Sequence, residues 1–160
     1  MGTIMDYTDD GLTSEQGLGI FLAILASTAI LYLVVLVITY LVMSVSMMVF
    51  FRKTGVEPWK AWVPVYSYYE WLRLGGQNGN WVWFILVPGA SIITTIFLFI
   101  GMHATGKAFR LDTGFLVLGI FLPVVWLLML GLGSRPYEPQ LIAEAGLRPP
   151  LTGFGAVPGA

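Results

Sequence analysis

The chain of 160 residues contains no cysteine, a single histidine and few charged residues. Without cysteine it can form no disulfide, iron–sulfur cluster or cysteine-ligated zinc site, and it has no thiolate nucleophile. Only 11% of its residues are charged and 57% are hydrophobic. In soluble domains about 25% of residues are charged and about 45–50% are apolar. This balance excludes a disordered chain, a nucleic-acid-binding module and an ordinary soluble enzyme. It predicts an integral membrane protein whose partners are lipids and other membrane subunits.

The charges are unevenly distributed along the sequence. No basic residue precedes Arg52, and four acids fall in the first fifteen residues: Asp6, Asp9, Asp10 and Glu15. The segment after the first apolar run carries four basic residues, namely Arg52, Lys53, Lys60 and Arg73. Lys and Arg concentrate in cytoplasmic loops. We therefore expect residues 1–16 outside the cell, residues 52–80 in the cytoplasm, and a multi-pass protein of a bacterial plasma membrane.

Three uncharged runs predict an all-α fold with three transmembrane helices, over residues 17–51, 81–106 and 113–133. A span needs about 20 apolar residues, so the first helix is unusually long, and an acidic N-terminus favours an uncleaved anchor over a signal peptide. Pro88 and Pro123 are expected to kink the second and third helices. A re-entrant second segment is the alternative, and it would move the loop 107–112 to the other side of the membrane.

Aromatic side chains concentrate between the first two runs, in residues 52–80 and just beyond. Such rings gather at the headgroup level of a membrane, so this segment is predicted to form short helices in the interface. The expected anchors are Trp59, Trp62, Tyr66, Tyr69, Trp71, Trp81 and Trp83. Glu70 and Arg73 are three residues apart and could pair on one helix face.

No set of residues predicts catalysis, a bound cofactor or a metal site. His103 could be a metal ligand or proton carrier, but a lone histidine near a helix end more simply suits the membrane interface. Ser91 and His103 are twelve residues apart on one helix, about 18 Å, so they cannot form a catalytic pair. In the loop 107–112, an ion pair among Lys107, Arg110 and Asp112 is expected to fix the turn.

Two features point to partners in the membrane. The Pro/Gly-rich tail, residues 134–160, has a composition that does not order in isolation, so we expect something outside the chain to hold it. Small residues spaced by four, Ala23 with Ser27 and Gly101 with Thr105, allow helices to approach closely. They serve either a partner or packing within the chain.

The order of several motifs resembles a family of small, uncharacterised actinobacterial membrane proteins whose domain is sometimes fused ahead of signal peptidase I. The motifs lie within about residues 45–137. They are Phe51-Arg52-Lys53-x-Gly55, Trp59-x-Ala61-Trp62-Val63-Pro64-x-Tyr66, Pro88, Gly106-Lys107-Ala108-Phe109, Thr113-Gly114-Phe115 and Leu122-Pro123. Ser67 stands where members of the family often have Asn. The resemblance implies an actinobacterial plasma membrane and no established activity.

The sequence therefore predicts a non-catalytic accessory or structural subunit of a larger membrane complex, for which a respiratory or oxidase assembly is one host suggested by analogy. One alternative is a channel or transporter component that works as a homo-oligomer. Another is a membrane factor linked to secretion.

Overall fold

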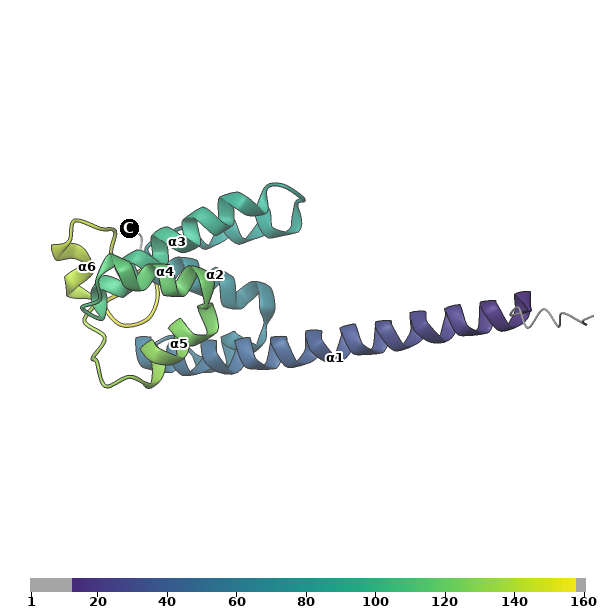
Figure 1. Cartoon of the computed structure of the whole chain (residues 1–160). Coiled ribbons are helices and arrows are strands. Elements are labelled where there is room, and N and C mark those ends of the chain that lie inside the picture. Colours follow the sequence, from purple (N-terminus) through teal and green to yellow (C-terminus); the bar gives the residue numbers. More distant parts are fainter. Residues whose placement is uncertain (1–12, 158–160) are drawn as a thin grey trace, which may run out of the picture. The chain divides into compact units, whose positions relative to one another are not determined.

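A computed structural model describes residues 13–157, and every regular element in that range is a helix. The all-α prediction is thus confirmed for the described residues. The elements are α1 (Ser14–Thr54), η1 (Pro58–Trp62), α2 (Pro64–Leu74), η2 (Gly79–Leu86), α3 (Ser91–Ala108), α4 (Thr113–Phe121), α5 (Pro123–Leu132) and α6 (Gln140–Glu144) (Figure 1). The acidic residues Asp6, Asp9 and Asp10 lie outside the described range. The chain divides into two units, residues 1–40 and 41–160.

Helix α1 has defined signals at both ends. At its start the Gln16 amide donates to the Thr13 hydroxyl and the Thr13 amide to the Gln16 side chain, at 3.3 and 3.0 Å, a reciprocal capping box. At its end Gly55 adopts φ +81° and the Val56 amide donates to Phe51 O at 2.9 Å, as in a Schellman motif. The 41 residues between span about 60 Å.

Among the described residues, two helices, α1 and α3, are long and apolar enough to cross a membrane, and not the three that the sequence predicted. The predicted third span, residues 113–133, is divided at Leu122 into α4 and α5. Pro123 does not kink a continuous helix there, because it begins α5 after the break. Each piece, nine and ten residues long, is too short to cross a bilayer alone.

The predicted second span also has a different structure. Residues 79–86 form the 3-10 helix η2, a turn contains Pro88 and Gly89, and the α-helix begins only at Ser91. The chain reverses at this turn: the Trp81 and Phe97 rings stack with centroids 4.7 Å apart, and the Thr94 hydroxyl donates to Trp81 O at 2.6 Å. Pro88 therefore belongs to the tip of a hairpin rather than to a kinked helix (Figure 1).

The core of the second unit is built from large aromatic side chains. Phe50 lies 5.9 Å from Trp126 and 6.4 Å from Phe109, between ring centroids, and Trp126 lies 6.4 Å from Trp71. All four are almost completely buried. The end of α1, α2, the end of α3 and α5 thus share one hydrophobic cluster.

The C-terminal tail joins the ends of three helices of the second unit. Its amides donate to their last carbonyls: Phe154 to Thr54 in α1, Leu151 to Arg73 in α2, and Glu138 to Ala108 in α3, at 2.8, 2.8 and 2.9 Å. Carbonyls at a helix C-terminus have no partner within the helix, so the tail supplies donors to Thr54 O and Ala108 O, while Arg73 O also accepts from the Gly76 amide at 3.0 Å. The tail is held by its own chain, whereas its composition suggested an external partner.

Candidate functional site

A cluster of charged side chains between η1 and α2 is the candidate site. Glu70 is fully buried, and its two carboxylate oxygens lie 2.9 Å from Lys60 Nζ and 3.5 Å from an Arg73 guanidinium nitrogen. Pro64 begins α2, which places Glu70 and Arg73 one turn apart on the same helix face. Lys60 comes from η1. We call these three residues the charge clamp.

The electrostatics of the clamp favour a structural role. Burial lowers the pKa of Lys60, but the hydrogen bond and negative charge of Glu70, together with Tyr66 and Glu57, outweigh burial and leave that pKa raised. Lys60 therefore stays protonated at neutral pH and cannot act as a general base there. Glu57 adds a second, exposed carboxylate 3.4 Å from Lys60 Nζ, so the two acids and two bases of this region balance.

Stacked aromatic rings lie beside the clamp. The ring centroids of Trp59 and Tyr66 are 5.8 Å apart, and those of Tyr66 and Tyr69 are 5.7 Å apart. Lys60 Nζ lies 5.4 Å from the Tyr66 centroid, and the Arg73 guanidinium lies 5.6 Å from that of Tyr69, within cation–π range. The tyrosines also line an open, largely apolar groove of about 310 Å³, together with Val63, Val65, Asn80, Val82 and Trp83.

The clamp is connected to the tail through Arg73. Its guanidinium donates to Leu151 O at 2.8 Å, while the Leu151 amide donates to Arg73 O at 2.8 Å. A charged side chain and a backbone group of one residue thus hold the same tail residue from both sides.

The expected interfacial anchors occupy different environments. Trp59, Trp62 and Trp83 are exposed, and Tyr66, Tyr69 and Trp81 are half-buried. Trp71 is only 3% exposed and belongs to the core. Of the basic residues used to predict orientation, Arg52 is exposed, Lys53 donates to Gly133 O, and Lys60 and Arg73 pair with Glu70.

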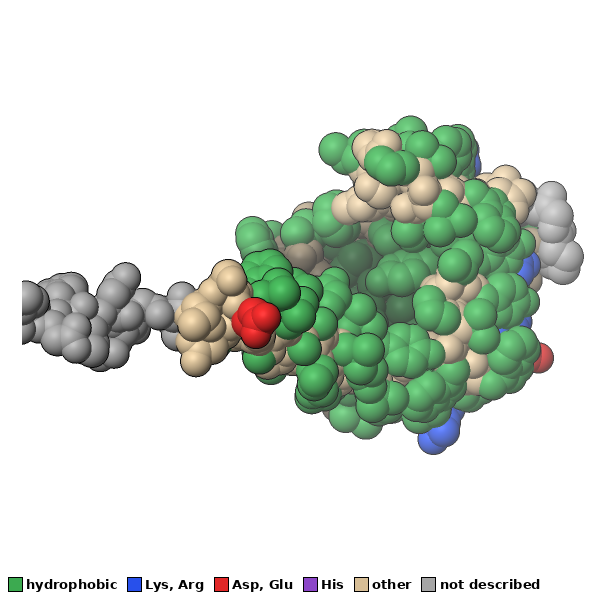
Figure 2. All heavy atoms as spheres, turned by 90° about the vertical axis from the view of Figure 1, so that its right-hand side faces the viewer, with side chains coloured by type: hydrophobic (Ala, Val, Ile, Leu, Met, Phe, Trp, Pro, Cys, Tyr) green, Lys and Arg blue, Asp and Glu red, His purple; other side chains and the backbone are tan. Residues whose placement is uncertain are grey.

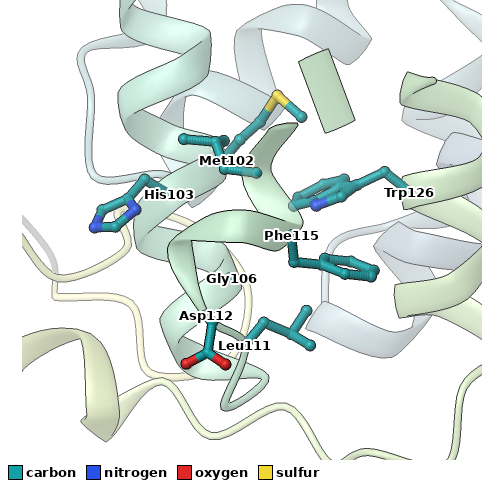
Figure 3. Close-up of a pocket in the computed structure, with 8 residues that line it drawn as sticks. Met102, His103, Gly106, Leu111, Asp112, Phe115 and Trp126 are labelled. Atoms are coloured by element: carbon teal, nitrogen blue, oxygen red, sulfur yellow. The ribbon is translucent and has the colours of Figure 1, made fainter. Parts of the chain in front are cut away.

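A much smaller cavity than the groove lies beside His103. It has a volume of about 10 Å³ and is lined by Met102, His103, Gly106, Leu111, Asp112, Phe115, Leu116 and Trp126. Figure 3 shows the imidazole of His103 pointing away from the rings of Phe115 and Trp126. A cavity of this size holds at most one water molecule, so it offers no room for a substrate. Within residues 13–157, no three His, Cys, Asp or Glu side chains are grouped to bind a metal ion.

The charged loop before α4 pairs differently from the prediction. Arg110 forms its ion pair with Glu138 of the tail, at 2.8 Å, and not with Asp112. Its carbonyl accepts a hydrogen bond from Arg135 at 3.4 Å. The residues joined by each of these two bonds are 25 or more positions apart in the sequence, so local spacing could not have identified the pairs.

The comparisons with known proteins add one finding. A model described as "Family of unknown function (DUF5684)" matches residues 59–139, which include the charge clamp, the elements from η2 to α5 and the start of the tail. No curated protein and no solved structure matches the chain.

Proposed function

The chain belongs to the DUF5684 family of unknown function, and we propose that it is a non-catalytic accessory subunit that binds other integral membrane proteins through α1. The observation that carries the proposal is the surface of that helix. From Leu18 to Ile38 its large apolar side chains are 43–69% exposed, on every side of the helix. A helix that is hydrophobic all round belongs in a membrane or against other helices.

The small residues of the two long helices support this role. Gly101 of α3 is buried, and a Cβ added to it would lie 3.2 Å from Gly75 Cα, so the small pair in α3 serves packing within the chain. Ala23 and Ser27 of α1 are exposed. Their spacing suits close contact with a helix of another subunit.

The charge clamp supports the non-catalytic part of the proposal. Glu70 is engaged by two cations, and Arg73 also holds the tail. Each group is occupied by a structural partner within the chain. A plasma-membrane location, an actinobacterial source and a respiratory or oxidase host are finer parts of the same proposal, to be decided by the identity of the partners.

The test is purification of the full chain from its native membrane in mild detergent, followed by identification of stoichiometric partners. We expect recovery with a larger membrane complex, and expect Ala23→Leu to reduce that recovery several-fold. Ala29→Leu is the matched control, because six residues place it about 120° around the helix from Ala23. Recovery as a lone homo-oligomer would support the channel or transporter alternative instead.

A further inference from the structure

The second unit contains two hairpins whose open ends lie together. In the first, η2 runs out to Pro88 and α3 returns, with Trp81 against Phe97. In the second, α4 runs out to Leu122 and α5 returns. The two ends of the second hairpin meet, because Arg135 donates to Arg110 O at 3.4 Å and Glu138 pairs with Arg110 at 2.8 Å. Both turns lie on the same side of this unit (Figure 1).

The arms of both hairpins have about half the length needed to cross a bilayer. Helices α4 and α5 have nine and ten residues, about 14 and 15 Å. The eight residues of η2 reach about 16 Å at the 3-10 rise of about 2.0 Å per residue. Most residues of α3 from Gly101 onward are buried, and Leu98 and Phe99 also pack against the core, so at most residues 91–100, about 15 Å, are available to enter lipid. The hydrocarbon core of a bilayer is about 30 Å thick, so each hairpin can enter one leaflet only.

The turns themselves suit hydrocarbon. Backbone groups at membrane depth must be satisfied within the protein. Pro88 and Pro123 carry no N–H, the Leu122 amide donates to Leu118 O at 2.7 Å, and the Ala90 amide donates to Val87 O at 3.1 Å. The Leu122 carbonyl accepts from the Trp126 amide at 3.0 Å, the first bond of α5, so both backbone groups of Leu122 are satisfied within the protein.

The surface at the turns is apolar and the surface at the open ends is charged. Exposed side chains near the two turns are Trp83, Ile85, Leu86, Val87, Ile92, Ile96, Val117, Ile120, Phe121, Leu122 and Val125. Hydrophobic side chains dominate this face of the second unit in Figure 2, where the visible Lys and Arg side chains lie at the margin. The open ends carry Lys107, Arg110, Arg135 and Glu138.

We infer that residues 41–157 bind the acyl chains of a single leaflet through these two re-entrant hairpins, so that α1 is the one helix that crosses. Both ends of each hairpin and the tail then lie on the same side of the membrane as Arg52. All eight Lys and Arg residues of the chain, Arg52 to Arg148, lie on that side. Basic residues mark the cytoplasmic side, so this side is the cytoplasm.

The inference rests on the membrane location contained in the proposed function and does not depend on a protein partner. Because the chain has no cysteine, single cysteines introduced into the full chain report one position each. Asn80→Cys, Thr113→Cys and Ser134→Cys place a thiol at an exposed site near an open end. Leu122→Cys places one at a turn. Each variant is treated with a membrane-impermeant maleimide, in intact cells and in inside-out vesicles.

We expect Asn80→Cys, Thr113→Cys and Ser134→Cys to be labelled in inside-out vesicles and not in intact cells. Leu122→Cys should resist the reagent in both preparations and react once detergent dissolves the membrane. Labelling of Thr113→Cys from the opposite side to Ser134→Cys would overturn the hairpin, since it requires residues 113–133 to cross. Labelling of all three only in intact cells would overturn the assigned side, and labelling of Leu122→Cys without detergent would overturn its immersion.

The outcomes also separate this inference from the proposed function. Recovery of the chain in the soluble fraction would overturn both. Recovery in the membrane without any partner subunit, with the labelling pattern expected above, would overturn the accessory role and leave the hairpins supported.

Discussion

At the scale of single residues, Glu70 offers the sharpest test of the charge clamp. Its side chain is fully buried between Lys60 and Arg73. Removing one partner of a buried ion pair costs about 3–5 kcal/mol, because the other charge stays buried; Lys60 and Arg73 keep some exposure, so we expect the lower end. Glu70→Gln should therefore lower the free energy of unfolding by about 3 kcal/mol, measured by denaturation of the full chain in detergent.

Glu57→Gln is the matched control for that substitution. It removes the other carboxylate near Lys60, but this carboxylate is 63% exposed, and exposed ion pairs contribute about 0–1 kcal/mol. Equal destabilisation by both variants would contradict a clamp centred on Glu70. Loss of partner binding by Glu70→Gln at unchanged stability would give the residue a role in recognition instead.

Tyr137 gives a second prediction at this scale, on pH. Its hydroxyl is buried without a hydrogen-bond partner among the described residues, and burial raises the pKa of Tyr137 above its ordinary value. The unfolded chain therefore loses this proton first as pH rises, so stability is full below about pH 10 and falls above it. Tyr137→Phe should be neutral or stabilising by up to about 1 kcal/mol at pH 8 and should reduce the alkaline loss, measured by denaturation at pH 8 and 10.5. A less stable variant at pH 8 would indicate a partner for the hydroxyl.

Residues close in sequence were predictable and distant partners were not. The spacing of Glu70 and Arg73 predicted their pair, which forms at 3.5 Å. Lys60 joins them because the chain turns between η1 and α2, and no periodicity encodes that turn. Trp71 lies among aromatic residues that face outward, so composition placed it at the interface, but its helix position directs it to Trp126 in the core.

At the scale of elements, the crossing of α2 and α3 depends on two glycines. A Cβ at Gly75 would lie 2.2 Å from Gly101 Cα. Because both atoms belong to or are fixed to the backbone, this clash can be relieved only if the two helices move apart. Gly75→Ala should destabilise the chain by about 1–3 kcal/mol, the usual cost of overpacking. Gly106→Ala in α3 is the control, since its Cβ would meet no atom within 4 Å, and Ala favours a helix by about 1 kcal/mol over Gly. The measurement is the thermal unfolding temperature of both variants in detergent. Equal unfolding temperatures for Gly75→Ala and Gly106→Ala would contradict the close approach of the two helices at Gly75.

Hydropathy identified the apolar segments but not where they reverse. Residues 113–133 form an unbroken apolar run, and a proline in such a run can kink a helix or end it. The difference is made by Leu122, whose φ of −132° and ψ of 65° are not helical, and by the pairing of Arg110 with Glu138. That contact closes the hairpin over 28 residues, which no local pattern can show.

At the scale of the whole chain, the fold changes which side of the membrane the basic residues are expected to occupy. Three crossings would place Lys107 and Arg110 outside the cell, against six basic residues within. The bond from Arg135 to Arg110 O and that from Lys53 to Gly133 O bring three of these side chains to one end of the second unit. If both hairpins re-enter the leaflet as we infer, every basic residue meets the positive-inside tendency.

The tail provides the last prediction, because its role distinguishes a self-contained fold from a docking strap. Removing residues 149–160 deletes the bonds from Leu151 to Arg73 O, from Phe154 to Thr54 O and from the Arg73 guanidinium to Leu151 O. At about 1 kcal/mol for each of the two neutral bonds and about 1.5–3 kcal/mol for the charged one, the loss should be about 3.5–5 kcal/mol, seen as a lower unfolding temperature. Removing residues 158–160 alone keeps all three bonds and should change nothing. Membrane recovery should persist in both, since α1 is intact. If the shorter chain kept its stability and lost its partners, the tail would be a docking strap after all.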